Sequence, residues 1–223
     1  MRRVATWVVT GANRGIGLEI CRQAHARGDS VVAACRGASP ELEAVGCRVV
    51  EGVDVTSDDA VAQLDSALGD EAVDVLVCNA GQLRHERIDA LDLDGARLQY
   101  EVNALGALRV VSALLPRLGQ GSKIGLVSSK AGSMGDGPSG GMYGYRMSKA
   151  ALNMAAANMA HELAPRGIAV VALHPGFVRT EMTGGTGNVD PSEAAAGLIA
   201  RIDELDAERS GSFVHANGDE IPW

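Results

Sequence analysis

The sequence predicts an α/β protein with a doubly wound, parallel sheet of roughly seven strands in a single domain. Short β-branched runs alternate with helix-length stretches along the chain. The runs are continuously apolar, as in parallel strands that are buried on both faces. The length of 223 residues suits one α/β domain better than two.

Each element follows from this alternation, which implies right-handed crossovers between parallel strands. Strands are expected at residues 4–9, 31–34, 48–50, 73–77, 123–127, 169–173 and 212–214. Helices are expected at residues 15–27, 57–68, 95–118, 145–164 and 191–208. Glycine-rich loops at 132–144 and near 182–190 follow strands, on the side where open α/β sheets bind ligands, so we expect substrate loops there.

Composition narrows the class of function. Hydrophobic residues make up 46% and charged residues 22%, as in globular proteins, while aromatic residues make up only 3%. Small aliphatic residues should therefore fill the core and allow helices to approach the sheet closely. The net charge of −8, without a basic block, argues against nucleic-acid binding through bulk charge.

No apolar run approaches the roughly 20 residues that a membrane span needs, so no membrane association is expected. Met1, Arg2 and Arg3 lead directly into the first expected strand, without a signal-peptide pattern. A cytoplasmic protein is the simplest interpretation. The four cysteines form no C-x-x-C pair and fit reduced core thiols, and neither they nor the histidines show metal-ligand spacing, so no metal is predicted.

A glycine-rich turn ends the first strand, in the run from Thr10 to Gly17. Gly11, Gly15 and Gly17 allow a tight turn, close approach of the backbone to a pyrophosphate, and close packing of the next helix. The N-terminus of that helix directs its N–H groups at the phosphates. The alternative is a glycine-rich turn without a ligand. The position between strand and helix favours a dinucleotide-binding Rossmann fold.

The end of the second strand indicates which nucleotide binds. An NAD site usually has an acidic residue there, but here Arg36 occupies the segment and no acid occurs before Glu41. Arg14 in the glycine turn could reach the same point. Two guanidinium groups without a carboxylate suit the 2′-phosphate of NADP(H), unless both are solvated surface arginines.

Tyr145 and Lys149 lie four residues apart at the start of a predicted helix and therefore share one face. A neighbouring ammonium should lower the phenol pKa from its usual value of about 10, as proton exchange with a carbonyl or alcohol requires. Tyr143 lies on another face and cannot form this pair. Such a pair taken alone is more often a surface contact.

Several motifs in order make the chain resemble a short-chain dehydrogenase/reductase of the classical type, from Thr10 to at least Thr180. The glycine turn matches T-G-x-x-x-G-x-G, and residues 54–56 resemble the segment beside the adenine. Residues 78–81 match N-N-A-G, except that Cys78 replaces the first asparagine. Residues 129–132 resemble the S-x-x-G motif, and residues 175–180 the segment that lines the nicotinamide.

The resemblance implies roles for individual residues. Tyr145 would be the general acid and base, and Lys149 would hold the nicotinamide ribose. Ser129 would bind the substrate oxygen, since only one of two adjacent serines can face it, and Asn103 would hold a water of the proton relay. The implied cofactor-binding residues are Gly11, Asn13, Arg14, Gly15, Ile16, Gly17, Arg36, Asp54, Val55, Asn79, Ala80, Gly81, Tyr145, Lys149, Pro175, Gly176, Val178 and Thr180.

The run around Tyr145 and the tail at 218–223 are similar to a carbonyl-reductase-like branch that includes C-factor-like signalling proteins. This branch puts the usual family tetramer in doubt and leaves a homo-oligomer possible. The prediction is an NADP(H)-dependent oxidoreductase acting on a small or medium apolar carbonyl, or on the corresponding alcohol. Alternatives are a non-catalytic NADP-binding sensor or signalling protein, and a sugar-nucleotide epimerase or dehydratase, for which too little chain follows Lys149.

Overall fold

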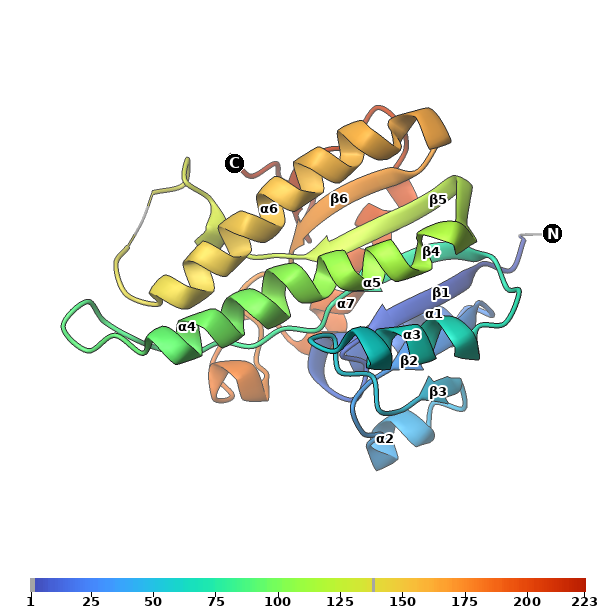
Figure 1. Cartoon of the computed structure of the whole chain (residues 1–223), viewed down its shortest axis with the longest axis horizontal. Coiled ribbons are helices and arrows are strands. Elements are labelled where there is room, and N and C mark those ends of the chain that lie inside the picture. The colour runs from blue at the N-terminus through green and yellow to red at the C-terminus, as the bar shows by residue number, and fades with distance from the viewer. Residues whose placement is uncertain (1–2, 138) are drawn as a thin grey trace.

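A computed structural model describes residues 3–137 and 139–223. Seven strands form one sheet in the order β3-β2-β1-β4-β5-β6-β7, and all neighbours pair in parallel (Figure 1). The predicted fold class is confirmed, and the strand order reverses between β1 and β4, where such sheets bind ligands. The strands are β1 (Thr6–Thr10), β2 (Ser30–Ala34), β3 (Arg48–Val50), β4 (Val73–Cys78), β5 (Leu118–Val127), β6 (Ala169–His174) and β7 (Ser212–His215).

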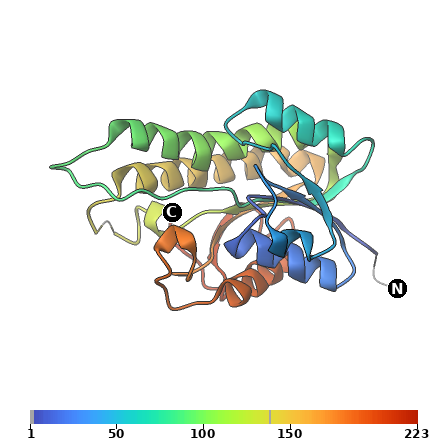
Figure 2. The same ribbon diagram turned by 90° about the horizontal axis from the view of Figure 1, so that it is seen from below.

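Helices cover both faces of the sheet (Figure 2). One face carries α3 (Asp58–Ala67), α4 (Leu93–Tyr100), α5 (Gly106–Leu114) and α6 (Tyr143–Leu163). The other carries α1 (Gly15–Ala26), the short α2 (Pro40–Glu43) and α7 (Pro191–Glu204). Two cores of mainly Ala, Val, Leu and Ile side chains separate these helices from the sheet, as the composition predicts.

The single helix predicted at 95–118 is wrong in detail. Between α4 and α5 the chain forms a π-helical turn, Glu101–Leu105, and a 3-10 turn, Leu115–Arg117, follows α5. Strand β5 begins directly after the 3-10 turn, because Leu118 already pairs with Val73 of β4. The strand is therefore longer than predicted, and Pro116 in the 3-10 turn cannot donate the hydrogen bond that would continue a helix.

Other helices also differ from the prediction, in their presence or in their bounds. Helix α2 was not predicted; Pro40 opens it, and the Ser39 hydroxyl accepts a hydrogen bond from the Leu42 N–H at 3.2 Å. Helix α6 begins two residues earlier than expected, at Tyr143. Helix α7 ends at Glu204 instead of 208, because Leu205 is already extended, with ψ 127°.

The four cysteines are free, and all except Cys47 are buried. Burial raises the pKa of the Cys78 thiol to about 12, so the residue that departs from the N-N-A-G motif is an inert part of the core. None of the helices within residues 3–137 and 139–223 is long and apolar enough to cross a membrane.

Candidate active site

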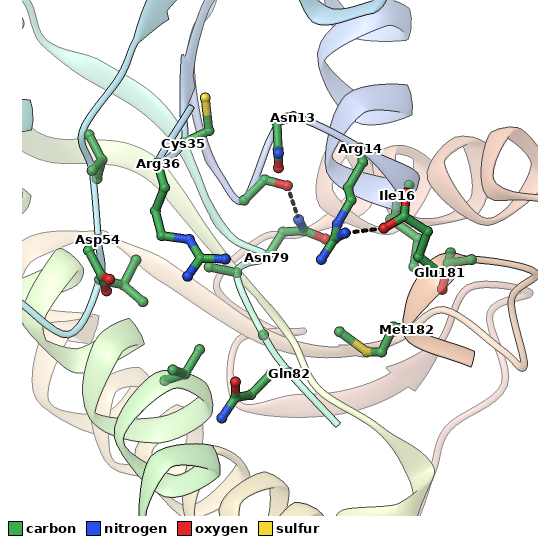
Figure 3. Close-up of a pocket in the computed structure, with 18 of the residues that line it drawn as sticks. Asn13, Arg14, Ile16, Cys35, Arg36, Asp54, Asn79, Gln82, Glu181 and Met182 are labelled. Carbon is green, nitrogen blue, oxygen red and sulfur yellow. Dashed lines mark hydrogen bonds and ion pairs between the residues drawn. The ribbon is translucent and has the colours of Figure 1, made fainter. Parts of the chain in front are cut away.

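A cavity of about 510 Å³ opens at the carboxyl ends of β1, β2 and β4 (Figure 3). Most of the residues predicted to bind the cofactor line it: Gly11, Asn13, Arg14, Gly15, Ile16, Arg36, Asp54, Val55, Asn79, Ala80, Gly81 and Thr180. The predicted residues Gly17, Tyr145, Lys149, Pro175, Gly176 and Val178 are outside this lining. Residues outside the predicted cofactor-binding set also line it: Cys35, Val53, Thr56, Gln82, Leu98, Val102, Arg179, Glu181, Met182 and Pro191. Of these, Thr56 and Arg179 belong to segments already assigned to the cofactor, and Met182 to the second expected substrate loop.

The glycine turn is held against the end of β4 by Asn79. Its side-chain amide donates to the carbonyl oxygens of Thr10 and Gly11 at 3.0 and 3.1 Å. A Cβ at Gly17 would lie 2.4 Å from that amide and from the Gly11 oxygen, and Gly11 itself has φ +65°. Gly17 therefore permits helix packing and does not line the cavity, whereas Gly11 supplies the left-handed turn.

The first turn of α1 presents open N–H groups to the cavity. Arg14 occupies the N-cap position in an extended conformation and provides no side-chain cap to the helix. Two or more backbone N–H groups at a helix N-terminus, together with the positive end of its dipole, form a favourable environment for an anion. The pyrophosphate of a dinucleotide fits this end of the cavity.

The two arginines predicted to bind a 2′-phosphate lie differently (Figure 3). The guanidinium of Arg14 is paired with the Glu181 carboxylate on one side of the cavity, while Arg36 lies on the other side and forms no ion pair with any described residue. Asp54, on the same side as Arg36, accepts hydrogen bonds from the N–H and hydroxyl of Thr56 at 2.9 and 2.8 Å. Those bonds lower the pKa of Asp54 and orient its carboxylate. Arg36 is thus the guanidinium available to a further phosphate.

Tyr145 and Lys149 project from the start of α6 toward the segment that follows β5. The Ser129 hydroxyl is near enough to the Tyr145 phenol to lower its pKa, and the Lys149 ammonium lies 5.8 Å from the centre of the Tyr145 ring. A Cβ at Gly132 would lie 2.6 Å from the carbonyl carbon of Lys149. The absence of a side chain at Gly132 therefore lets the turn that begins at Ser129 rest on the backbone of α6.

The expected lowering of the Tyr145 pKa is wrong in this structure. Burial raises the pKa of Tyr145, and the influence of Ser129 only opposes that effect. Lys149 is 4% exposed, and its ammonium donates to the Val127 carbonyl oxygen at 2.7 Å. Burial also lowers the pKa of Lys149 to about 8. Helical spacing places the two residues on one face, but desolvation is the larger influence on both groups.

Asn103 lies in the π-helical turn and is 1% exposed. Its side chain accepts from the N–H of Gln82 at 2.8 Å and donates to the Gln82 carbonyl at 2.9 Å and the Ser148 hydroxyl at 3.0 Å. A Cβ at Gly81 would lie 3.2 Å from the Asn103 oxygen and 3.8 Å from the Lys149 nitrogen. Asn103 thus joins the segment after β4 to α6, immediately beside Lys149.

The neighbouring serines face different partners. Ser128 is buried, and its hydroxyl donates to the Asn153 side-chain oxygen at 2.5 Å. Ser129 is the serine that contacts Tyr145.

Among the residues the sequence analysis missed, Gln82 and Glu181 carry a recognisable signal, because each directly follows a segment already assigned to the cofactor.

The cavity at the switch in strand order, with a serine, tyrosine and lysine gathered at its end of the sheet, defines a Rossmann-fold oxidoreductase. The family model for short chain dehydrogenases matches residues 5–189. The chain belongs to the short-chain dehydrogenase family.

Relatives and solved structures agree with this assignment. Over 226 residues, 99% of this chain and 100% of the relative, the chain is 44% identical to 1-hydroxy-2-glutathionyl-2-methyl-3-butene dehydrogenase of Rhodococcus sp. (strain AD45). It is 42% identical over 160 residues to C-signal of Myxococcus xanthus, covering 68% of this chain and 93% of that protein. NADPH-bound carbonyl reductase from chicken fatty liver superimposes with a TM-score of 0.91 at 29% identity, with both chains covered completely.

Proposed function

We propose that the protein uses NADP(H) to interconvert a carbonyl compound and its alcohol, with Tyr145 as the general acid and base. The observation that carries the proposal is the grouping of three side chains after β5 and at the start of α6: the Ser129 hydroxyl acts on the Tyr145 phenol and lowers its pKa, and the Lys149 ammonium lies 5.8 Å from the centre of the same ring. The dehydrogenase of Rhodococcus and the carbonyl reductase structure support both directions of this chemistry within the family.

The residues present fit NADP(H) better than NAD(H). Arg36 would hold the 2′-phosphate, since no carboxylate occupies its place at the end of β2. The open N–H groups of α1 would hold the pyrophosphate. Lys149 would also reach the nicotinamide ribose, and residues 175–180 would lie along the nicotinamide, as the family resemblance implies.

In the direction of reduction, bound NADPH supplies a hydride to the carbonyl carbon. Ser129 donates a hydrogen bond to the carbonyl oxygen, and the Tyr145 hydroxyl transfers its proton to that oxygen as negative charge develops there. The raised pKa of Tyr145 keeps it protonated at neutral pH, which suits a proton donor. Lys149, with a pKa of about 8, is largely charged at pH 7 and stabilises the phenolate left behind.

The loops at 132–144 and 182–190 would enclose the substrate; residue 138 lies outside the described residues. Met182 lines the cavity from the second loop. We propose a small or medium apolar carbonyl as substrate, which agrees with the few large side chains near this end of the sheet. A cytoplasmic location and a homo-oligomer stay predictions.

Two measurements test the proposal. A ligand at about 100 times its Kd stabilises a protein by about 2.7 kcal/mol, so NADPH should raise the thermal midpoint clearly and NADH less. Tyr145→Phe should keep the NADPH shift and lose turnover of a carbonyl panel, followed by NADPH absorbance. An absence of shift with either nucleotide, or full turnover by Tyr145→Phe, would contradict the proposal.

The similarity to C-signal favours a second candidate, an NADP-binding signalling protein without turnover. Ser129, Tyr145 and Lys149 argue against it, because a sensor has no chemical need for all three. The two candidates separate in one experiment. A protein that binds NADPH but reduces none of a broad panel of ketones and aldehydes would favour signalling.

A further inference from the structure

We propose that Glu86 is a positioning residue for Tyr145, acting through a hydrogen bond to the first turn of α6. This inference rests on the proposed function, because it concerns the alignment of the proton donor. It draws on a segment that carries none of the family motifs, the stretch between β4 and α4.

Helix α6 begins without a cap of its own. Met142 occupies the N-cap position and makes no side-chain hydrogen bond to the helix. Its backbone is left-handed, with φ 51° and ψ 43°, and within the described residues it is the only residue other than glycine with positive φ. A non-glycine residue in this region is strained and persists only where its surroundings hold it in place.

Glu86 provides what the helix lacks. Its carboxylate oxygen Oε1 accepts a hydrogen bond from the N–H of Gly144, and its backbone oxygen accepts from the N–H of Met142 at 2.9 Å. The loops before α4 and before α6 extend at the same end of the molecule (Figure 1). A carboxylate at a helix N-terminus satisfies an open N–H and interacts favourably with the dipole. Glu86 therefore caps α6 from a distant part of the chain.

The first turn of α6 has little room to move. A Cβ at Gly144 would lie 2.7 Å from the Ala96 Cα and 2.6 Å from the Gln99 side-chain nitrogen. The turn is thus held between α4 on one side and Glu86 on the other. Tyr145 is the next residue, so a shift of Gly144 changes where the phenol meets Ser129.

The burial of the Glu86 carboxylate is unfavourable for the stability of the fold. It is 7% exposed, it forms no ion pair with any described residue, and its second oxygen, Oε2, is buried without a hydrogen-bond partner. A buried carboxylate with an unsatisfied oxygen opposes folding. Removing the Glu86 carboxylate should therefore leave the free energy of unfolding nearly unchanged, while the start of α6 becomes free to move. Removal of a residue with a purely structural role would instead lower the stability.

The experiment compares Glu86→Ala with Glu86→Gln, which retains an acceptor for the Gly144 N–H. A misplacement of about 1 Å can cost about a hundredfold in rate, so Glu86→Ala should lower kcat by about 10- to 100-fold with little change in KM. Glu86→Gln should stay within about threefold of the parent kcat, since the hydrogen bond is kept. Without nucleotide, amide hydrogen exchange at residues 143–146 should be about tenfold faster in Glu86→Ala, as expected for a lost cap, and should be restored in Glu86→Gln.

Ser122→Ala is the matched control, because Ser122 is a buried polar residue in β5 whose hydroxyl bonds the Val73 carbonyl at 2.7 Å, away from the cavity. It should lower the thermal midpoint without lowering kcat. Parent-level kcat in Glu86→Ala, equal losses in both Glu86 variants, or an equal loss of kcat in Ser122→Ala would each overturn the assignment. Tyr145→Phe distinguishes the two proposals: if it is inactive while Glu86→Ala is fully active, only the role of Glu86 fails.

Discussion

Replacing Lys149 with Met should stabilise the nucleotide-free protein at pH 7. The pKa of Lys149 is lowered from 10.5 to about 8 because the ammonium is buried. One pKa unit corresponds to about 1.4 kcal/mol, so keeping this group charged in the folded state costs about 3 kcal/mol. Met also removes the hydrogen bond from the charged ammonium to the Val127 oxygen, worth about 2 kcal/mol. The expected net gain is therefore about 1 kcal/mol in the free energy of unfolding.

The pH dependence of the stability difference between Lys149→Met and the parent gives a sharper test of the cost of burial. Below about pH 8 both the folded and the unfolded states carry the Lys149 proton, and the full cost is present. Between about pH 8 and 10.5 the folded state loses the proton and the unfolded state keeps it, so stability of the parent rises with pH. The advantage of Lys149→Met should shrink across this window.

Urea unfolding at several pH values, without nucleotide, measures this difference between variant and parent. Lys130→Met is the control, because Lys130 is half exposed and paired with Asp136 at 2.9 Å. Its effect should not change sign or size across the same window. A variant at Lys149 that is less stable than the parent at pH 7, or whose difference does not depend on pH, would refute the assigned cost of burial.

Three further predictions concern the cavity and the serine turn. Arg36→Ala should weaken NADPH binding about tenfold or more, the usual value of a hydrogen bond to a charged group, and leave NADH binding unchanged in a titration. Glu181→Gln should free Arg14 and tighten NADPH binding with almost no change in stability, because this ion pair is exposed; unchanged affinity would mean that Arg14 does not reach the nucleotide. Gly132→Ala should collide with the backbone of Lys149 and lower kcat while the NADPH-induced thermal shift is kept.

The sequence was sufficient for the sheet and for most of the cavity. Continuous apolar runs and the glycine turn correctly predicted the parallel strands and the end of the sheet where the cavity opens, because both depend on local chain chemistry. The pairing of Arg14 with Glu181 was not predictable, since the partners lie far apart in sequence and meet only when the segment after β6 folds over the turn. For the same reason, Glu86 carried no sequence signal of its role at α6.

The error in the Tyr145 pKa has a related physical origin. Helical geometry fixes which residues share a face, and Tyr145 and Lys149 do share one. Helical geometry does not determine how much water surrounds each group or which acceptor the ammonium bonds. Here the Lys149 ammonium donates to the Val127 oxygen. Desolvation therefore shifts both groups toward their neutral forms.

The π-helical turn shows how a helix can serve the site and the core together. Each residue advances an α-helix by about 100°, so one additional residue in the turn at Glu101–Leu105 rotates everything after it relative to α4. Asn103 can then bond both backbone groups of Gln82, while α5 still packs Val110 and Leu114 into the core. Gly106 directly follows the π-helical turn and opens α5 in close contact with the segment after β3, because a Cβ at Gly106 would lie 2.7 Å from a Val55 side-chain carbon. A sequence analysis based on a regular helical period does not detect such an offset, although it did single out Asn103 as a candidate residue of the site.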